Sequence, residues 1–451
     1  MSDSKSNVED VGETAQEPSI PSTSPAHNES RTKPPPYSQG TTDRTTTEAS
    51  VSPMNTGVLK WYARGVVDNQ IGIFLHLVSV LVLTHLYVPT ARPFTSRLLL
   101  LSHYNPDTQL YGISTDDFYL VGFYVFFLSG LRVFLMEHVL APVGRQLGLS
   151  NGRDLKRFSE QGWLLSYFFV SWILGMYIYC TSECFLNMRQ MFTDWPTREL
   201  PAITKAYILG QWAFWQQQVI AIHLEERRRD HWQMLAHHVI ANALIFTSYV
   251  LHLTRVANLI LVLMDVVDIV FCLAKCLKYL GYSTLCNITF GVFMITWFVA
   301  RHVFYLMTMW SIWIDMAEVI PVGCYHGSQR DLKGPTPLPQ HGWMHILDPF
   351  LNPAGTICFS RAIQGWFLGS LGFLQILTMV WFIMIIKVAI RVVKGDGATD
   401  IRSVHESENE EEQEEEGWVT AVVEEGVDEI VGGGGSYRGW RGGERAGHGG
   451  I

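Results

Sequence analysis

The sequence predicts an all-α protein, a polytopic transmembrane helical bundle of about eight spans with disordered tails. Between residues 61 and 394, apolar runs recur whose length is close to the roughly 20 residues that a helix needs to cross a bilayer. Only 17% of the 451 residues are charged, well below the roughly 25% of a soluble domain. The formal net charge of -9 arises at the two ends of the chain, because the block between them is net basic. A basic middle block is expected beside anionic lipid.

Each apolar run is expected to form one spanning helix. The expected spans are residues 71–88, 118–139, 163–180, 207–224, 234–253, 258–280, 287–314 and 366–388. Several of them contain Gln, His or Arg, which places polar groups at membrane depth. Lys and Arg gather in every second connection, so the positive-inside rule places both termini in the cytosol.

We expect the chain to divide into four segments, of which composition separates only the two tails from the transmembrane block. They are a disordered cytosolic tail (1–60), the first transmembrane spans (61–160), a catalytic transmembrane core (161–394) and an acidic, Gly-rich disordered cytosolic tail (395–451). Within the core, residues 315–361 are expected to form a long lumenal loop, and loops of that length are usually functional or disordered. Cys324 and Cys358 lie near the ends of this loop, where a disulfide is permitted, but sequence alone leaves their pairing open.

The two tails carry short motifs that predict regulation. Pro34, Pro35 and Tyr37 belong to a Pro-Pro-x-Tyr motif of the kind that WW domains bind, although chance proline clusters are common in such tails. In the acidic tail, Ser403 and Ser407 each precede a glutamate by three residues. Acidophilic kinases prefer that pattern, and phosphorylation there would deepen the negative charge of the tail.

Two adjacent histidines and two aspartates lie inside apolar helices. His237 and His238 belong to the fifth expected span, and Asp265 and Asp268 lie three residues apart in the sixth. An ionisable group at bilayer depth is costly unless it is paired or hydrated, so these four residues predict a catalytic site. A histidine held by a carboxylate can remove a proton from an amine or attack an activated acyl group. Neither reaction needs a metal, and no cofactor is expected.

Other polar side chains near these four are predicted to bind substrate. They are Arg227, Arg228 and Arg229 at the cytosolic mouth, Asn242, Ser248 and Tyr249 farther along the fifth span, and Trp297, Arg301 and Tyr305 in the seventh. Opposite charges at matching depth predict that Arg301 neutralises one aspartate while the other aspartate orients a histidine. The alternative interpretation is a network that only holds the helices together. For Arg301, this structural role and a functional role are equally favoured.

These residues resemble the signature of the ceramide synthases of the TLC-domain family, in particular its fungal members. The resemblance is carried by Arg229-Asp230, Met234, His237-His238, Ser248-Tyr249, Thr254-Arg255, Met264-Asp265-Val266-Val267-Asp268, Lys275, Gly291-Val292-Phe293-Met294, Trp297, Arg301-His302 and Tyr305. It covers roughly residues 161–393, so the catalytic core would be a TLC domain. Many members have Asn where this chain has His252, and Gly where it has Ala257.

The resemblance implies an acyltransferase of the endoplasmic reticulum membrane that joins the acyl group of acyl-CoA to the amine of a sphingoid base, giving ceramide and CoA. The mouth arginines would meet the CoA phosphates. His237 would accept the acyl group or a proton, with His238 as its helper. The expected partners are both substrates, membrane lipid, a second synthase chain and a small regulatory subunit, and no nucleic acid.

Two other functions remain open from the residues alone. A non-catalytic TLC-family protein that binds, senses or transports lipid is disfavoured because both histidines and both aspartates are present. A proton- or ion-coupled transporter also uses buried Asp, His and Arg, but the chain shows no inverted repeat.

Overall fold

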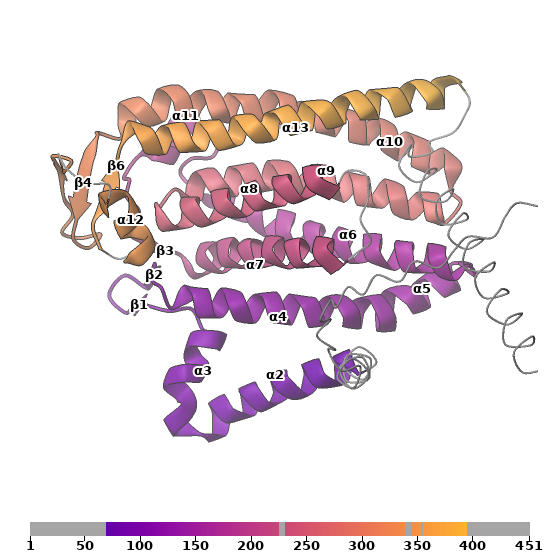
Figure 1. The fold of residues 1–451 in the computed structure, drawn as a ribbon, viewed down its shortest axis with the longest axis horizontal. Helices are drawn as coiled ribbons and strands as arrows, with labels where there is room; N and C mark the ends of the chain where they lie inside the picture. The colour runs from indigo at the N-terminus through magenta and orange to yellow at the C-terminus, as the bar shows by residue number, and fades with distance from the viewer. Residues whose placement is uncertain (1–68, 225–230, 340–343, 353–354, 395–451) are drawn as a thin grey trace, which may run out of the picture. The chain divides into compact units, whose positions relative to one another are not determined.

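A computed structural model describes residues 69–224, 231–339, 344–352 and 355–394 of the chain (Figure 1). Several predicted sites lie outside these residues. They are the Pro34, Pro35 and Tyr37 motif, the serines Ser403 and Ser407, and the arginines Arg227, Arg228 and Arg229. Their roles therefore stay predictions.

The described residues are mostly helical, and each predicted span falls on a helix. The helices are α2 (Gln70–Tyr87), α3 (Arg92–Leu99), α4 (Asp117–Leu135), α5 (Ala141–Gln146), α6 (Gly152–Thr181), α7 (Ala202–Leu224), α8 (His231–Val250), α9 (Thr254–Tyr279), α10 (Ser283–Phe298), α11 (Tyr305–Val319), α12 (Met344–Leu351) and α13 (Arg361–Lys394). Two π-helices, η2 (Met136–Leu140) and η4 (Val299–Phe304), continue α4 into α5 and α10 into α11, and η3 (Met188–Phe192) is a short 3-10 helix.

Local sequence explains where several helices begin and end. The Asn151 side chain accepts a hydrogen bond from the backbone N–H of Arg153 at 3.1 Å, which caps the N-terminus of α6. Gly281 follows the end of α9 with a φ of 77°, a left-handed conformation that glycine adopts without steric cost. Both ends therefore follow ordinary capping chemistry.

Fewer helices have the length and apolar composition of a membrane span than the sequence predicted. Five helices within the described ranges are long and apolar enough to cross a membrane: Asp117–Gln146, Gly152–Thr181, Thr254–Tyr279, Ser283–Val319 and Arg361–Ile390. A sixth is reached if Ile71–Tyr87 and Pro89–Leu99, which meet at 107°, count as one broken span. Helices α7 and α8 do not qualify, and both carry several polar side chains. About eight spans are therefore not confirmed.

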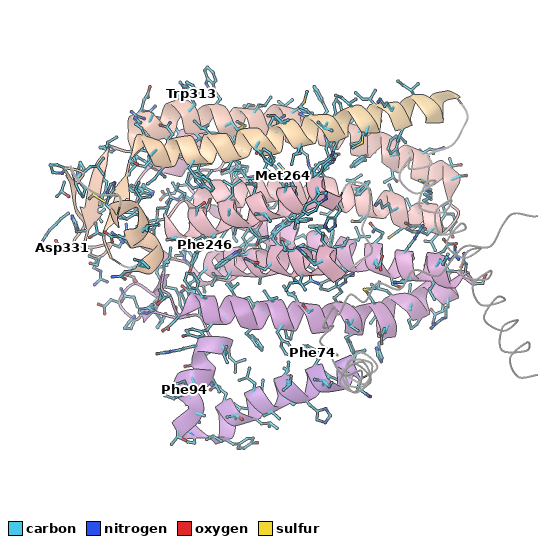
Figure 2. The ribbon with its side chains drawn as sticks, in the orientation of Figure 1. Phe74, Phe94, Phe246, Met264, Trp313 and Asp331 are labelled. Carbon is cyan, nitrogen blue, oxygen red and sulfur yellow. A yellow bond between two sulfur atoms is a disulfide. The ribbon has the colours of Figure 1, made fainter. Side chains whose placement is uncertain are left out.

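Helix α9 lies at the centre of the bundle. Half of its most apolar stretch is buried, whereas the corresponding stretches of the other candidate spans are 11–22% buried. It packs against α6, α8 and α10, and a Cβ atom added at Gly175 of α6 would lie 2.6 Å from Val262 of α9. That glycine permits the close approach of the two helices. In Figure 2, Met264 of α9 lies among the helices, whereas Trp313 of α11 projects away from them.

Two small antiparallel sheets correct the all-α prediction. Strands β1 (Tyr104–Asn105), β2 (Leu110–Gly112) and β3 (Glu199–Leu200) pair in the order β1-β2-β3, and β4 (Gly323–His326), β5 (Lys333–Thr336) and β6 (Ile357–Phe359) pair in the order β5-β4-β6. The second sheet orders much of the expected loop 315–361 at one end of the bundle (Figure 1). The prediction missed both sheets because strands of two to four residues carry almost no periodicity.

A disulfide bond joins Cys324 to Cys358. The two residues are direct partners in the ladder between β4 and β6. The bond therefore links the start of the long connection to its end, and it answers the pairing that the sequence left open.

A buried ion pair ties α4 to α7. Lys205 Nζ lies 2.7 Å from Asp117 Oδ1, and neither side chain is exposed to solvent. Lys205 also donates to the carbonyl oxygen of Gly112 on β2 at 2.6 Å. The hydroxyl of Tyr249 on α8 donates to Asp117 Oδ2 at 2.7 Å. This network connects α4, α7, α8 and the first sheet at the end of the bundle where α8 finishes.

Candidate functional site

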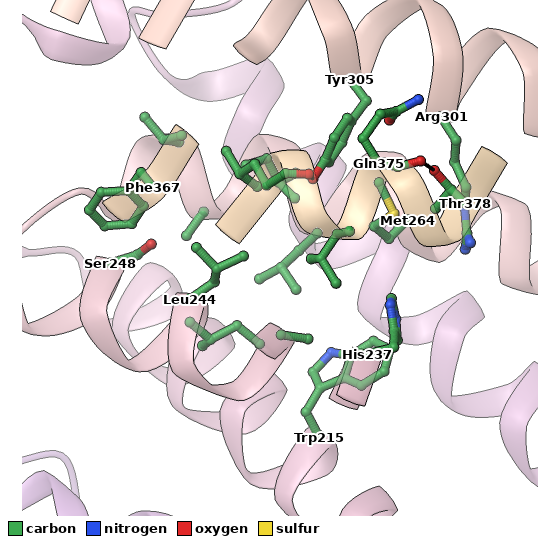
Figure 3. A pocket seen from close by; sticks show the side chains of 18 of the residues that line it. Trp215, His237, Leu244, Ser248, Met264, Arg301, Tyr305, Phe367, Gln375 and Thr378 are labelled. Carbon is green, nitrogen blue, oxygen red and sulfur yellow. Dashed lines mark hydrogen bonds between the residues drawn. The ribbon is translucent and has the colours of Figure 1, made fainter. Parts of the chain in front are cut away.

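An elongated cavity lies between α7, α8, α9, α13 and the η4–α11 segment (Figure 3). Most of its wall is apolar, with Leu, Ile, Val, Ala and Met side chains from α8, α9 and α13. The polar and aromatic exceptions are Trp215, His237, Ser248, Asp268, Arg301, Tyr305, Phe367, Gln375 and Thr378. A largely apolar cleft with a few polar groups is the usual form of a small-molecule site.

The polar groups gather at one end of the cavity. Along α8 the wall runs from His237 to Ser248, a distance of about 16 Å at 1.5 Å per residue. Arg301 lies at the His237 end, and Phe367 lies at the Ser248 end (Figure 3). Asp268 lies beside Arg301, its ion-pair partner. The cavity is thus a charged chamber that continues into an apolar tube.

The two histidines differ in their surroundings. The His237 ring faces the cavity, and its centroid lies 5.3 Å from the ring of Trp381 and 5.5 Å from that of His238. The His238 ring instead packs against Trp215 at 5.2 Å and is not part of the cavity wall. Among the described residues, neither Nδ1 atom has a hydrogen-bond partner. His237 is therefore the histidine that a molecule in the cavity would meet.

Arg301 pairs with one of the two aspartates, as the sequence predicted. Its Nη2 atom lies 2.9 Å from Asp268 Oδ1, and its guanidinium stacks over the Trp297 ring at 4.2 Å. The Arg301 side chain is 6% exposed and that of Asp268 22% exposed. Stacking on one side and ion pairing on the other hold the guanidinium in the cavity wall.

The prediction that the second aspartate orients a histidine is wrong. Asp265 is fully buried, and its Oδ2 atom accepts hydrogen bonds from Ser171 Oγ at 2.8 Å and from Gln211 Nε2 at 2.7 Å. Residues three apart on an α-helix differ by about 60° in direction. Asp265 therefore faces α6 and α7, while Asp268 faces η4.

The predicted substrate-binding residues of α8 also divide between two faces. Ser248 lines the cavity on the same stripe as His237. Asn242 and Tyr249 do not, because they lie on the adjacent stripe that faces α7 and α4. Asn242 donates to the carbonyl oxygens of Trp215 at 3.1 Å and His238 at 2.9 Å, and Tyr249 belongs to the Lys205 network. Both residues position α8 instead of contacting the cavity.

In the seventh predicted span, Tyr305 lines the cavity and Trp297 does not. The Tyr305 hydroxyl donates to the carbonyl oxygen of Leu371 at 2.9 Å, which connects α11 to α13. Trp297 is buried beneath Arg301. Its contribution to the site is therefore to hold the guanidinium.

The sequence reasoning missed the contribution of α13. Phe367, Gln375 and Thr378 line the cavity, and Gln375 Nε2 lies 2.8 Å from Nδ1 of His302 on η4. The available signal was the position of Gln375, an amide within the long apolar stretch of α13. The π-helix η4 was also missed, although π-helical segments are frequent at functional sites. It directs Arg301 toward α9 and His302 toward α13.

Within the described residues, no group of three or more His, Cys, Asp or Glu side chains is arranged to hold a metal ion. The arrangement offers an unpaired imidazole, a guanidinium and a carboxylate at the end of an apolar tube. These groups can accept a proton, attack an acyl carbon or stabilise an oxyanion. The tube can take a hydrocarbon chain.

Comparison with known proteins gives consistent matches. Residues 157–387 match the profile of the TLC domain, TRAM/LAG1/CLN8. The chain is 46% identical to Ceramide Synthase FUM18 of Gibberella moniliformis, over 75% of this chain and 79% of that protein. It is 39% identical to Sphingosine N-acyltransferase-like protein ALT7 of Alternaria alternata, over 67% and 70%. It is 36% identical to Sphingosine N-acyltransferase lag1 of Schizosaccharomyces pombe, over 72% and 76%.

Proposed function

Because this chain belongs to the TLC-domain family and is a ceramide synthase, we propose that its acyl transfer takes place at the charged end of the cavity, where His237 acts on the acyl group. The enzyme transfers a fatty acyl group from acyl-CoA to the amine of a sphingoid base and releases CoA. One observation supports this location above the others. His237, Arg301 and Asp268 share the wall of a cavity that is otherwise apolar.

The tube is proposed to hold the acyl chain. An extended hydrocarbon advances about 1.25 Å per carbon, given carbon–carbon bonds of about 1.5 Å. The distance of about 16 Å from His237 to Ser248 along α8 therefore matches about 13 chain carbons beyond the reacting carbonyl. Phe367 at the far end would limit longer chains. Ala257 also lines the tube, and where it replaces the glycine of many family members its methyl group narrows the tube.

His237 is proposed to act in one of two ways that use the same position. As a base, it takes a proton from the amine nitrogen as that nitrogen forms a bond to the thioester carbonyl carbon. The carbon–sulfur bond breaks, and the proton passes to the CoA thiolate. As a nucleophile, its ring nitrogen first displaces the CoA thiolate and holds the acyl group until the amine displaces the imidazole. His238 packs beside it as a positioning residue.

Arg301 is proposed to stabilise the oxyanion that forms at the thioester carbonyl, while Asp268 holds the guanidinium in place. Arg227, Arg228 and Arg229 precede α8 in the sequence. We keep the proposal that they bind the CoA phosphates. No cofactor besides the co-substrate acyl-CoA is required by this chemistry.

The apolar helices indicate a membrane protein, and we propose that it resides in the endoplasmic reticulum membrane with both termini in the cytosol. Helices α7 and α8 pack inside the bundle against α4, α9 and α13, and α8 lines the cavity with its polar stripe. Such helices can span a bilayer with lower hydropathy, because their polar groups face protein. With α7, α8 and the broken pair Ile71–Tyr87 and Pro89–Leu99 counted as spans, the five apolar helices become eight spans. A second synthase chain and a small regulatory subunit remain proposed partners.

The test is ceramide formation by purified full-length protein. The protein is incubated with sphinganine and a mixture of acyl-CoA lengths, and the products are measured by lipid mass spectrometry. The proposal predicts N-acyl sphinganines in amounts that depend on chain length. Folded protein that forms no ceramide from any pair of substrates would contradict it.

A further inference from the structure

His302 and Gln375 form a polar pair that joins η4 to α13. Gln375 Nε2 lies 2.8 Å from His302 Nδ1. Gln375 is part of the cavity wall, near Arg301 and Tyr305 in Figure 3. His302 lies behind it, with its ring 4.9 Å from that of Phe382. The pair therefore connects the cavity wall to the ring of Phe382 on α13.

The pair has hydrogen-bonding capacity that its described surroundings leave unused. In the part of the chain that the structure describes, neither His302 Nε2 nor Gln375 Oε1 has a hydrogen-bond partner, and both atoms are buried. If the Gln375 amide N–H donates to His302 Nδ1, the ring carries its hydrogen on Nε2. The Nε2–H donor and the Oε1 acceptor then have no partner. In the reverse assignment, Nδ1–H donates to the amide oxygen, and the amide N–H and the Nε2 acceptor are the groups without a partner.

Three neighbouring polar residues of the wall already have hydrogen-bond or ion-pair partners. Arg301 is held by Asp268, and the Tyr305 hydroxyl donates to a backbone carbonyl. The Thr378 hydroxyl donates to the backbone oxygen of Gln375, at 2.9 Å. A buried amide oxygen without a partner is costly, and a molecule in the cavity can remove that cost by hydrogen bonding to it.

Acyl-CoA offers its thioester carbonyl and the neutral amides of its pantetheine arm, and these amides lie beyond the thioester sulfur, on the CoA side. Its acyl chain is a hydrocarbon. A sphingoid base carries hydroxyl groups on the carbons that flank its amine, and a hydroxyl both donates and accepts. When the amine meets the acyl carbonyl at His237, a flanking hydroxyl reaches the same charged end of the cavity.

We propose that Gln375 is a specificity-determining residue that hydrogen-bonds a hydroxyl next to the amine of the sphingoid base, and that His302 is a positioning residue that orients the Gln375 amide. The inference rests on the proposed function and adds the group that selects the second substrate. A site that hydrogen-bonds a substrate hydroxyl discriminates against an analogue that lacks it, because its own polar group is then left unpaired.

The test measures kcat/KM for three bases with one acyl-CoA. The bases are sphinganine, 1-deoxysphinganine and 3-deoxysphinganine. Wild-type enzyme is expected to prefer sphinganine over one deoxy base by at least about tenfold, the value of one good hydrogen bond. The deoxy base that is disfavoured identifies the contacted hydroxyl. Equal kcat/KM for all three bases would overturn the inference without any variant.

Variants then locate the contact. Gln375→Leu is expected to lower kcat/KM for sphinganine about tenfold, to leave the disfavoured deoxy base unchanged, and to leave KM for acyl-CoA unchanged. His302→Phe is expected to reduce the same preference, with partial rescue by His302→Asn. Leu374→Met, on the same wall, is the control that alters packing only.

The outcomes separate the two proposals. If Gln375→Leu lowers kcat/KM for all three bases by one common factor, the role of Gln375 is structural and the inference fails. If wild-type enzyme forms ceramide but does not discriminate among the bases, the inference again fails while the proposed function stands. If wild-type enzyme acylates none of the bases, the proposed function itself fails.

Discussion

Blocking the tube at two depths should change the acyl-chain selectivity in two different ways. Ala241 lies one turn below His237 on the cavity-facing stripe of α8, about 6 Å along the helix axis. A leucine there obstructs the tube after about five chain carbons, at about 1.25 Å per carbon. Ser248 lies about 16 Å from His237, so Ser248→Leu affects only the last carbons of a long chain.

The size of the effect follows from the apolar surface that each displaced carbon loses. Burying one methylene group is worth about 0.8 kcal/mol, which corresponds to about fourfold in kcat/KM. A chain with three carbons displaced would therefore lose about 60-fold. Ala241→Leu should lower kcat/KM for a palmitoyl donor by at least that factor and spare a hexanoyl donor. Ser248→Leu, which displaces about one carbon, should lower the palmitoyl value about fourfold.

The assay offers sphinganine with an equimolar series of acyl-CoA lengths and reads the ceramide products by mass spectrometry. Ser248→Ala is the matched control, because it removes the hydroxyl without adding length. Melting temperature in detergent verifies that the variants are folded. The reasoning is refuted if both leucine variants change every chain length by one factor, or if Ala241→Leu leaves the palmitoyl product unaffected.

Three further predictions concern stability, each measured as thermal unfolding of the purified variant in detergent. Lys205→Met leaves the fully buried Asp117 carboxylate uncompensated and should destabilise the protein by about 3–5 kcal/mol, so a variant that unfolds at the wild-type temperature would contradict the ion-pair role. Arg301→Met should cost less, about 2 kcal/mol, because the Asp268 side chain is 22% exposed, and a larger loss than in Lys205→Met would reverse this ranking. Cys358→Ser opens a loop with a sequence separation of 34 and should cost about 3–4 kcal/mol, whereas an unchanged melting temperature would mean that the bond does not stabilise the second sheet.

Much of the helical fold was predictable because long apolar runs leave few alternatives in a bilayer. Each predicted span falls on a helix, and His237, Arg301 and Asp268 meet at one cavity because their depths along α8, η4 and α9 agree. Helical periodicity places His237 and Ser248 on one stripe of α8. It could not tell which of two adjacent stripes faces a cavity, since both contain polar residues.

The rest depends on contacts that one sequence does not encode locally. One partner of Asp265 is Gln211 on α7, and only the packing of α7 against α9 brings the two together. Gln375 enters the site because α13, the last helix of the described residues, packs against α8 and contacts His302 of η4. The positive φ of His252, 57°, places it in the left-handed region, where asparagine and histidine are tolerated, so this departure from the family pattern is compatible with the turn after α8.

The most direct test of the central role of His237 compares His237→Ala with His238→Ala in the ceramide-forming assay. His237 lines the cavity and His238 packs behind it against Trp215. We expect His237→Ala to lower kcat by about 100-fold to 10,000-fold, and His238→Ala to lower it less, with both variants folded. Wild-type turnover by folded His237→Ala would contradict the account.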